Sequence, residues 1–180
     1  MVQGAPLPRA VAIQDSAMAA PGLLIVDVQQ GFINAATRHV PPRVAALQDE
    51  YDRVYVTQFV NPADSPYRRW IDWQRFAPGS ADVQLAFSPR DDAVVIEKPI
   101  YSCVTPTFLD RLRNDRVDEV HLCGIATDNC VLTCAVDLFE AGVRPVVLAD
   151  FCASHGGADF HTWGLAILER LIGKAQVRRA

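Results

Sequence analysis

The sequence lacks both long hydrophobic runs and long basic runs. No apolar stretch approaches the roughly 20 residues that a membrane-spanning helix requires, and the first residues contain no compact apolar segment typical of a signal peptide. The net charge of −4 over 180 residues argues against nucleic acid as a partner, because phosphate binding depends on clustered lysine and arginine. We expect a cytoplasmic globular protein with no membrane partner. It would form one domain over residues 1–180, with an irregular lead-in over residues 1–21.

Nucleotide-binding motifs and paired cysteines are missing as well. No GxGxxG follows an apolar run, and no GxxxxGK[ST] is present, so dinucleotide and P-loop sites have no support. The five cysteines include no CxxC pair and no zinc-finger spacing. We therefore expect free thiols, a reducing compartment and no cofactor.

Short apolar runs alternate with amphipathic segments along the chain. This alternation predicts a three-layer α/β/α fold with a mostly parallel sheet of about six strands. The expected strands are residues 23–27, 54–57, 93–96, 120–123, 143–149 and 175–177. The expected helices are residues 41–51, 66–73, 105–114 and 159–172, and one that is capped by Thr127 or Asp128 and ended by Gly142.

Residues 119–142 contain the feature around which the rest is organised. Cys130 lies in the first turn of a helix that leaves the end of a strand, where ligands bind in open parallel sheets. A helix N-terminus favours a thiolate, and its free N–H groups can bind an oxyanion. The alternative interpretation is that Cys130 is a small core residue, as most cysteines are.

Two further ionisable residues belong to the same edge of the predicted sheet. Asp27 ends the first strand and Lys98 follows the third. Asp27 can take the thiol proton and later return it to a leaving group, while Lys98 can hold the carboxylate charged and stabilise the thiolate. If each residue is considered on its own, Asp27 could be a loop cap and Lys98 could be a solvated surface residue. Their shared position with Cys130 favours the chemical interpretation.

Three segments carry a family resemblance. They are LLIVDVQQGF, EKPIYSCV and GIATDNCVLTCAVDLFEAG, in this order. With them the chain resembles the isochorismatase-like cysteine hydrolases, the group that includes nicotinamidases and N-carbamoylsarcosine amidases. The resemblance covers residues 22–177 and implies a small-molecule substrate and a homo-oligomer, either a dimer or a tetramer.

The resemblance also implies the roles of individual residues. Asp27, Lys98 and Cys130 would form a triad that hydrolyses a small amide or ureido compound through a thioester on Cys130. A cis peptide between Ile125 and Ala126 would aim the N–H of Ala126, with that of Cys130, at the substrate oxygen. No redox cofactor would be needed.

Two departures from relatives narrow the expected chemistry. Nicotinamidases carry a metal site built from one Asp and several His after the second strand, but here Asp64 stands without any histidine between His39 and His121. We therefore expect no metal and a place in the metal-free amidase branch. Isochorismatases proper replace the nucleophile, so Cys130 argues against vinyl-ether hydrolysis. That reaction, and a non-catalytic redox-sensing or binding role, remain as alternatives.

The substrate pocket is less defined than the triad. Residues 58–90 hold several prolines and aromatic residues, and they form either a binding element or a surface loop whose aromatics pack on the core. The expected lining consists of Phe32, Trp70, Trp73 and Tyr101.

The histidines and arginines outside these motifs are harder to assign. We interpret His121, His155 and His161 as structural or surface residues. Arg68 or Arg69 could bind a substrate carboxylate, although solvation is the simpler interpretation.

Overall fold

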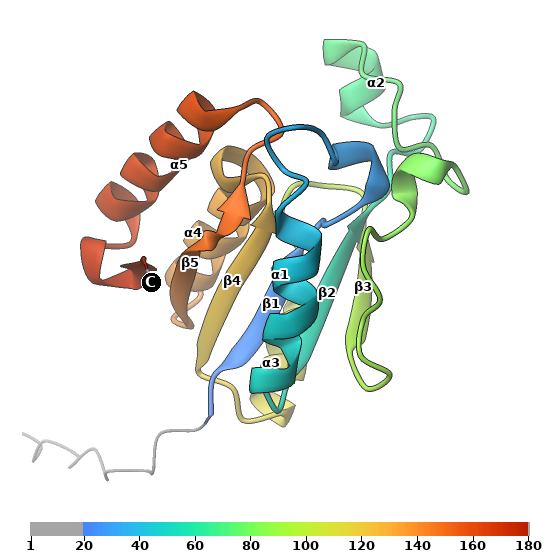
Figure 1. Cartoon of the computed structure of the whole chain (residues 1–180). Coiled ribbons are helices and arrows are strands. Elements are labelled where there is room, and N and C mark those ends of the chain that lie inside the picture. Colours follow the sequence, from blue (N-terminus) through green and yellow to red (C-terminus); the bar gives the residue numbers. More distant parts are fainter. Residues whose placement is uncertain (1–19, 180) are drawn as a thin grey trace, which may run out of the picture.

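The computed structural model describes residues 20–179, and its centre is a six-stranded parallel sheet (Figure 1). The strands lie in the order β3-β2-β1-β4-β5-β6, and every pairing is parallel. Their bounds are β1 Gly22–Val26, β2 Val54–Phe59, β3 Val94–Lys98, β4 Glu119–Ile125, β5 Arg144–Ala153 and β6 Val177–Arg178.

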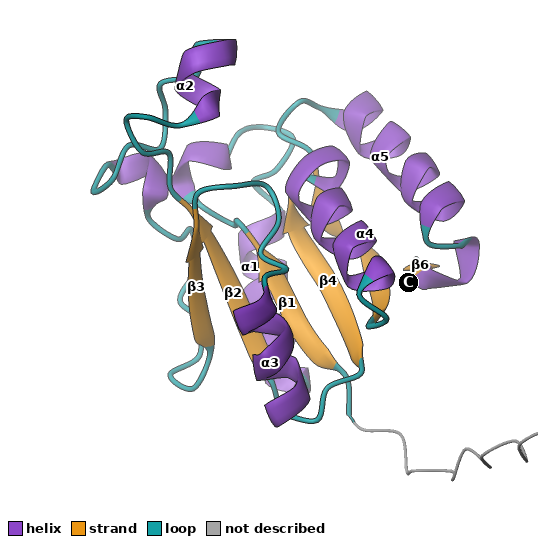
Figure 2. Ribbon diagram, turned by 180° about the vertical axis from the view of Figure 1, so that it is seen from behind, coloured by secondary structure: helices purple, strands orange, loops and turns teal. Residues whose placement is uncertain are grey.

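Helices cover both faces of the sheet. One face carries α1, and the opposite face, seen in Figure 2, carries α3 and α4. The helix α5 packs beside α4 and against the turn that precedes α4. The bounds are α1 Val40–Leu47, α2 Pro66–Ile71, α3 Pro106–Asn114, α4 Leu132–Glu140 and α5 Ala158–Leu171. The predicted three-layer α/β/α fold is thus confirmed.

The core follows the apolar pattern of the sequence. All five residues of β1 are buried, as expected for a central strand with helices on both faces. On α4 the buried side chains are Cys134, Ala135 and Leu138, which form one helical face. The five cysteines are all free and buried. Within residues 20–179 no helix has the length and apolar character needed to cross a membrane.

Several element boundaries differ from the sequence prediction. The strand β5 continues to Ala153, past the expected end at residue 149, and residues 48–50 form a separate 3-10 turn after α1. The prediction of a Thr127 or Asp128 cap is wrong, because a π-helical turn, Thr127–Val131, precedes α4 without a side-chain cap. The expected lead-in lies, up to residue 19, outside the described residues.

Candidate active site

Asp27 is the first residue after β1, and its backbone turns sharply there. Its φ of 47° is in the left-handed region, which Asp tolerates better than most residues. The hydroxyl of Thr57, on β2, accepts a hydrogen bond from the Asp27 N–H at 3.0 Å and donates one to Asp27 Oδ1 at 2.6 Å. Both residues are fully buried, so this pair of bonds fixes the direction of the carboxylate.

Lys98 reaches the same carboxylate from the end of β3. Its Nζ donates to Asp27 Oδ2 at 2.7 Å and to the carbonyl oxygens of Ile100 and Tyr101 at 3.0 and 2.9 Å. All three ammonium protons therefore have an acceptor. Burial alone would lower the pKa of Lys98, but the nearby negative charge of Asp27 outweighs it, so the pKa is raised and the side chain stays charged.

Cys130 lies in the π-helical turn between β4 and α4, with 6% of its surface exposed. Burial raises the pKa of its thiol well above the usual value, and the charge of Asp27 and a hydrogen bond to that carboxylate raise it further. Lys98 acts in the opposite direction but does not prevail. The resting side chain is thus a protonated thiol in the field of the Asp27 carboxylate. The thiolate expected from the helix terminus is not the resting form, because desolvation dominates.

The peptide bond between Ile125 and Ala126 is cis, which is the bond that the family resemblance implies. It lies where β4 ends and the Cys130 turn begins. The carbonyl oxygen of Ala126 accepts hydrogen bonds from the N–H groups of Asn129 and Val131, both at 3.1 Å. The carbonyl oxygen therefore takes part in the hydrogen bonds of the turn. Ala126 itself borders the cavity beside Cys130.

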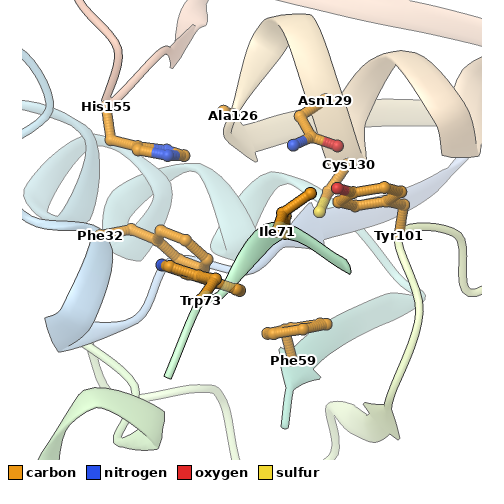
Figure 3. Close-up of a pocket in the computed structure, with 9 residues that line it drawn as sticks. All are labelled: Phe32, Phe59, Ile71, Trp73, Tyr101, Ala126, Asn129, Cys130 and His155. Atoms are coloured by element: carbon orange, nitrogen blue, oxygen red, sulfur yellow. The ribbon is translucent and has the colours of Figure 1, made fainter. Parts of the chain in front are cut away.

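A cavity of about 240 Å³ opens over the Cys130 thiol (Figure 3). Aromatic rings make up most of its wall, and no lysine, arginine, aspartate or glutamate contributes to it. The lining residues are Phe32, Phe59, Ile71, Trp73, Tyr101, Ala126, Asn129, Cys130 and His155. Lys98 lies behind this wall, with its Nζ 5.4 Å from the centre of the Phe59 ring.

The structure places three of the four expected pocket side chains at the cavity. Phe32, Trp73 and Tyr101 line the cavity, but Trp70 does not: it is 77% exposed and carries the Arg69 guanidinium over its ring. Its neighbour Ile71 takes the place at the cavity. A short helix such as α2 does not reveal from sequence alone which of its faces turns inward.

The segment 58–90 combines both interpretations that its sequence allows. Trp73 stacks near Phe32 and Phe59, with ring centres 6.2 and 5.6 Å away, and so shapes the cavity wall. Phe76 is fully buried and packs 4.1 Å from the Phe32 ring, as part of the core. The segment therefore supplies part of the cavity wall, and its aromatic residues also pack on the core.

The histidine interpretation needs one correction. His155 is a cavity residue, because the turn after β5 brings it to the same edge of the sheet as Asp27 and Cys130. His121 is buried between Tyr51 and Glu119, at 2.6 and 2.9 Å. His161 Nδ1 lies 2.7 Å from Thr127 Oγ1. These last two are structural.

Neither arginine of α2 lines the cavity. Arg68 donates to the carbonyl of Asn61 and to Gln74, and Arg69 is exposed. A substrate carboxylate would find no cationic partner on the cavity wall.

A metal site of the zinc-binding type does not fit the described residues. Within residues 20–179, no three His, Cys, Asp or Glu side chains gather closely enough to hold an ion. Asp64, the residue that the sequence singles out, is exposed in a turn.

The sheet, the helices and the buried Cys130 define a three-layer α/β/α protein with its candidate site at the carboxyl edge of the strands. The chain belongs to the isochorismatase family, since residues 21–177 match the Isochorismatase domain.

Individual relatives agree with this assignment. A Bacillus subtilis (strain 168) isochorismatase family protein, PncA, is 41% identical over 83 residues, which are 46% of this chain and 44% of that protein. A nicotinamidase of Acinetobacter baylyi is 25% identical and covers 78% of this chain and 86% of its own length. The N-carbamoylsarcosine amidase structure from Thermoplasma acidophilum superposes with a TM-score of 0.73 at 25% identity, covering 89% of this chain and 96% of that one.

Proposed function

We propose that this protein is a cysteine-dependent amidohydrolase that cleaves the C–N bond of a small, uncharged, planar amide. The observation that carries the proposal is the buried Cys130 thiol near the Asp27 carboxylate, which is itself paired with Lys98, beneath an aromatic cavity. Family membership supports a hydrolase, and the nicotinamidase and N-carbamoylsarcosine amidase relatives support an amide or ureido substrate.

The first step uses the resting thiol. As Cys130 Sγ attacks the carbonyl carbon, its proton passes to the Asp27 carboxylate, so no free thiolate has to exist beforehand. The backbone N–H groups of Ala126 and Cys130 would receive the developing oxyanion. Lys98 keeps a positive charge beside Asp27 and has no proton to lose in this step.

The second half regenerates the enzyme. Asp27 gives its proton to the departing nitrogen, the C–N bond breaks, and ammonia or an amine leaves a thioester on Cys130. Asp27 then accepts a proton from water as the water oxygen attacks the thioester carbon. The carboxylic acid product forms, and the proton returns to the Cys130 sulfur.

The cavity supports an uncharged acyl group. Stacked aromatic rings favour flat ligands, and no cationic wall residue is present to bind a carboxylate. A redox-sensing role has less support, because sensing needs an exposed thiolate and burial raises the pKa of the Cys130 thiol. Vinyl-ether hydrolysis would leave the Cys130 nucleophile without a role.

The test is intact-protein mass spectrometry after acid quenching, with a panel of small uncharged carboxamides. We expect a transient acyl adduct on Cys130. We also expect one molecule of ammonia to be released for each molecule of carboxylic acid formed. Cys130→Ala should lose both signals. Cys152→Ala, which removes another buried cysteine outside the cavity wall, should keep both. Ammonia release by Cys130→Ala at the wild-type rate would exclude the mechanism.

A further inference from the structure

The helix α5 exposes a row of large apolar side chains. Phe160, Trp163, Ile167 and Leu171 are each close to half exposed, and their spacing places them in one line along the helix. The rings of Phe160 and Trp163 meet edge to face, with their centres 5.2 Å apart. Figures 1 and 2 show α5 at the outer edge of the molecule. Because a contiguous apolar surface, unlike a single exposed residue, marks an interaction site, this row calls for a partner.

The opposite face of α5 fixes the helix on the rest of the protein. Leu165 and Leu168 are buried there. Gly164 packs so closely on the turn before α4 that a Cβ atom would lie 2.8 Å from the backbone of Asp128. The position of α5 and its rotation about its own axis are therefore set before any partner binds.

Two charged residues flank the row at its opposite ends. Asp159 lies in the first turn of α5 and Arg170 in the last turn. At about 100° per residue, both project from the side of the helix nearest Trp163 and away from the buried face. Both are exposed, and neither has an ion-pair partner within residues 20–179. One edge of the row thus carries a negative charge at one end and a positive charge at the other.

The apolar row is complementary to itself when two copies of α5 pack antiparallel about a twofold axis. With the axis near Leu165, residues equally far from it on either side face each other. Phe160 then faces the partner's Leu171, and Trp163 faces the partner's Ile167. The symmetry repeats each contact, so that all four side chains of the row on both copies become covered.

The charges select the same arrangement. In an antiparallel pair of helices, equivalent flanks of the two copies lie side by side. Asp159 therefore faces the partner's Arg170, and the twofold axis produces this opposite-charge contact at both ends of the interface. A parallel pair would place Asp159 against its own copy and Arg170 against its own copy, which is unfavourable.

We propose that α5 forms a homodimer interface in which two copies of this helix pack antiparallel along the apolar row. Aromatic residues such as Trp163 are typical of the centre of protein interfaces. An anionic lipid surface fits this helix less well. Helices that lie on membranes carry several lysines or arginines beside their apolar face, whereas α5 contains only Arg170 and the chain has a net charge of −4.

The first test is sedimentation velocity of the full chain over a range of concentrations. The wild type should sediment at twice the mass of the 19.8 kDa chain. Trp163→Glu places a charge within the row and should raise the dimer dissociation constant at least about 30-fold. Trp70→Glu, which changes another exposed tryptophan on the distant helix α2, should leave that constant unchanged.

The second test exchanges the flanking charges. Asp159→Arg or Arg170→Asp alone puts like charges opposite each other at both ends, and each should weaken the dimer about threefold or more. The double variant restores opposite charges and should return within about twofold of the wild-type dissociation constant. Since both side chains are exposed, this test stands even if Trp163→Glu does not fold.

Several outcomes would overturn the proposal. A wild type that stays monomeric at all concentrations, or a folded Trp163→Glu that remains as dimeric as the wild type, would exclude the interface. A dimer lost in Trp70→Glu alone would move the interface to α2. A double charge variant as weak as the single variants would exclude the antiparallel arrangement. A monomeric wild type that co-sediments with phosphatidylserine vesicles would assign the row to a membrane surface instead.

Discussion

Lys98 Nζ lies 2.7 Å from Asp27 Oδ2, and both side chains are withdrawn from solvent, with 4% and 0% exposure. The two residues come from β3 and from the end of β1, with β2 between them in the sheet. Each charge compensates for the burial of the other. The pair thereby maintains a carboxylate next to the Cys130 thiol in surroundings where an isolated charge would be unfavourable.

Removing one member of this pair should cost more stability than removing both charges. Lys98→Met leaves a buried carboxylate and Asp27→Asn leaves a buried ammonium, so each should lower the free energy of unfolding by about 3–5 kcal/mol. The double variant Asp27→Asn/Lys98→Met should regain most of that loss, yet hydrolyse no amide. Urea denaturation at equilibrium measures the stabilities. A double variant less stable than both single variants would contradict the ion-pair interpretation.

Thr57 should matter to catalysis through its hydroxyl, although it does not line the cavity. Thr57→Val preserves the shape of the side chain but removes both hydrogen bonds to Asp27. We expect kcat for ammonia release to fall at least about tenfold and stability to fall by about 1–3 kcal/mol, since a buried N–H loses its acceptor. Thr57→Ser keeps the hydroxyl and should stay near the wild-type rate. Equal rates for the two variants would show that the carboxylate needs no such orientation.

The pH dependence of Cys130 alkylation should report its raised pKa. Iodoacetamide reacts with the thiolate, so the rate should keep rising through pH 9 and should not level off there. Lys98→Met should slow alkylation at any one pH, because Lys98 lowers the pKa of this thiol. Peptide mass spectrometry assigns the modified cysteine, and Cys130→Ala supplies the background. A plateau below pH 9 would mean that burial does not control the thiol.

Gly124 should tolerate no side chain. A Cβ built there would lie 2.1 Å from the carbonyl oxygen of Val26 on β1, and the φ of 120° is unfavourable for any other residue. Gly124→Ala should therefore lower the free energy of unfolding by about 3 kcal/mol or more. Gly142→Ala, with a φ of 79° and open space around it, should cost only about 1 kcal/mol. Similar losses in both would locate the effect in φ alone.

Much of the fold was accessible from the sequence because burial on both faces leaves a visible pattern. The run that forms β1 is wholly apolar, and Pro106 and Thr105 mark the start of α3, where Thr105 Oγ1 accepts from the Phe108 N–H. The end of β5 was not accessible. Asp150 interrupts its apolar run, but pairing of Cys152 with Gly124 on β4 continues the strand, after a shift in register.

The candidate site likewise contains residues that the sequence predicts and features that it does not. Asp27, Lys98 and Cys130 could be placed at one edge because the carboxyl ends of parallel strands lie together. The same reasoning applied to β5 would have brought in His155. The pKa direction of Cys130 and the choice of Ile71 over Trp70 depend on tertiary packing, and neither has a local sequence signal.

The order of the strands has a consequence for how the protein becomes active during folding. Asp27 and Lys98 are 71 residues apart in the sequence. The Cys130 turn follows β4, which pairs with β1 but is synthesised after β2 and β3. Contacts of such long separation are slow to form. A chain that has emerged only as far as β3 contains both residues of the charge pair but lacks the nucleophile. After dilution from denaturant, the rate of amide hydrolysis should therefore recover more slowly than the helical circular dichroism signal.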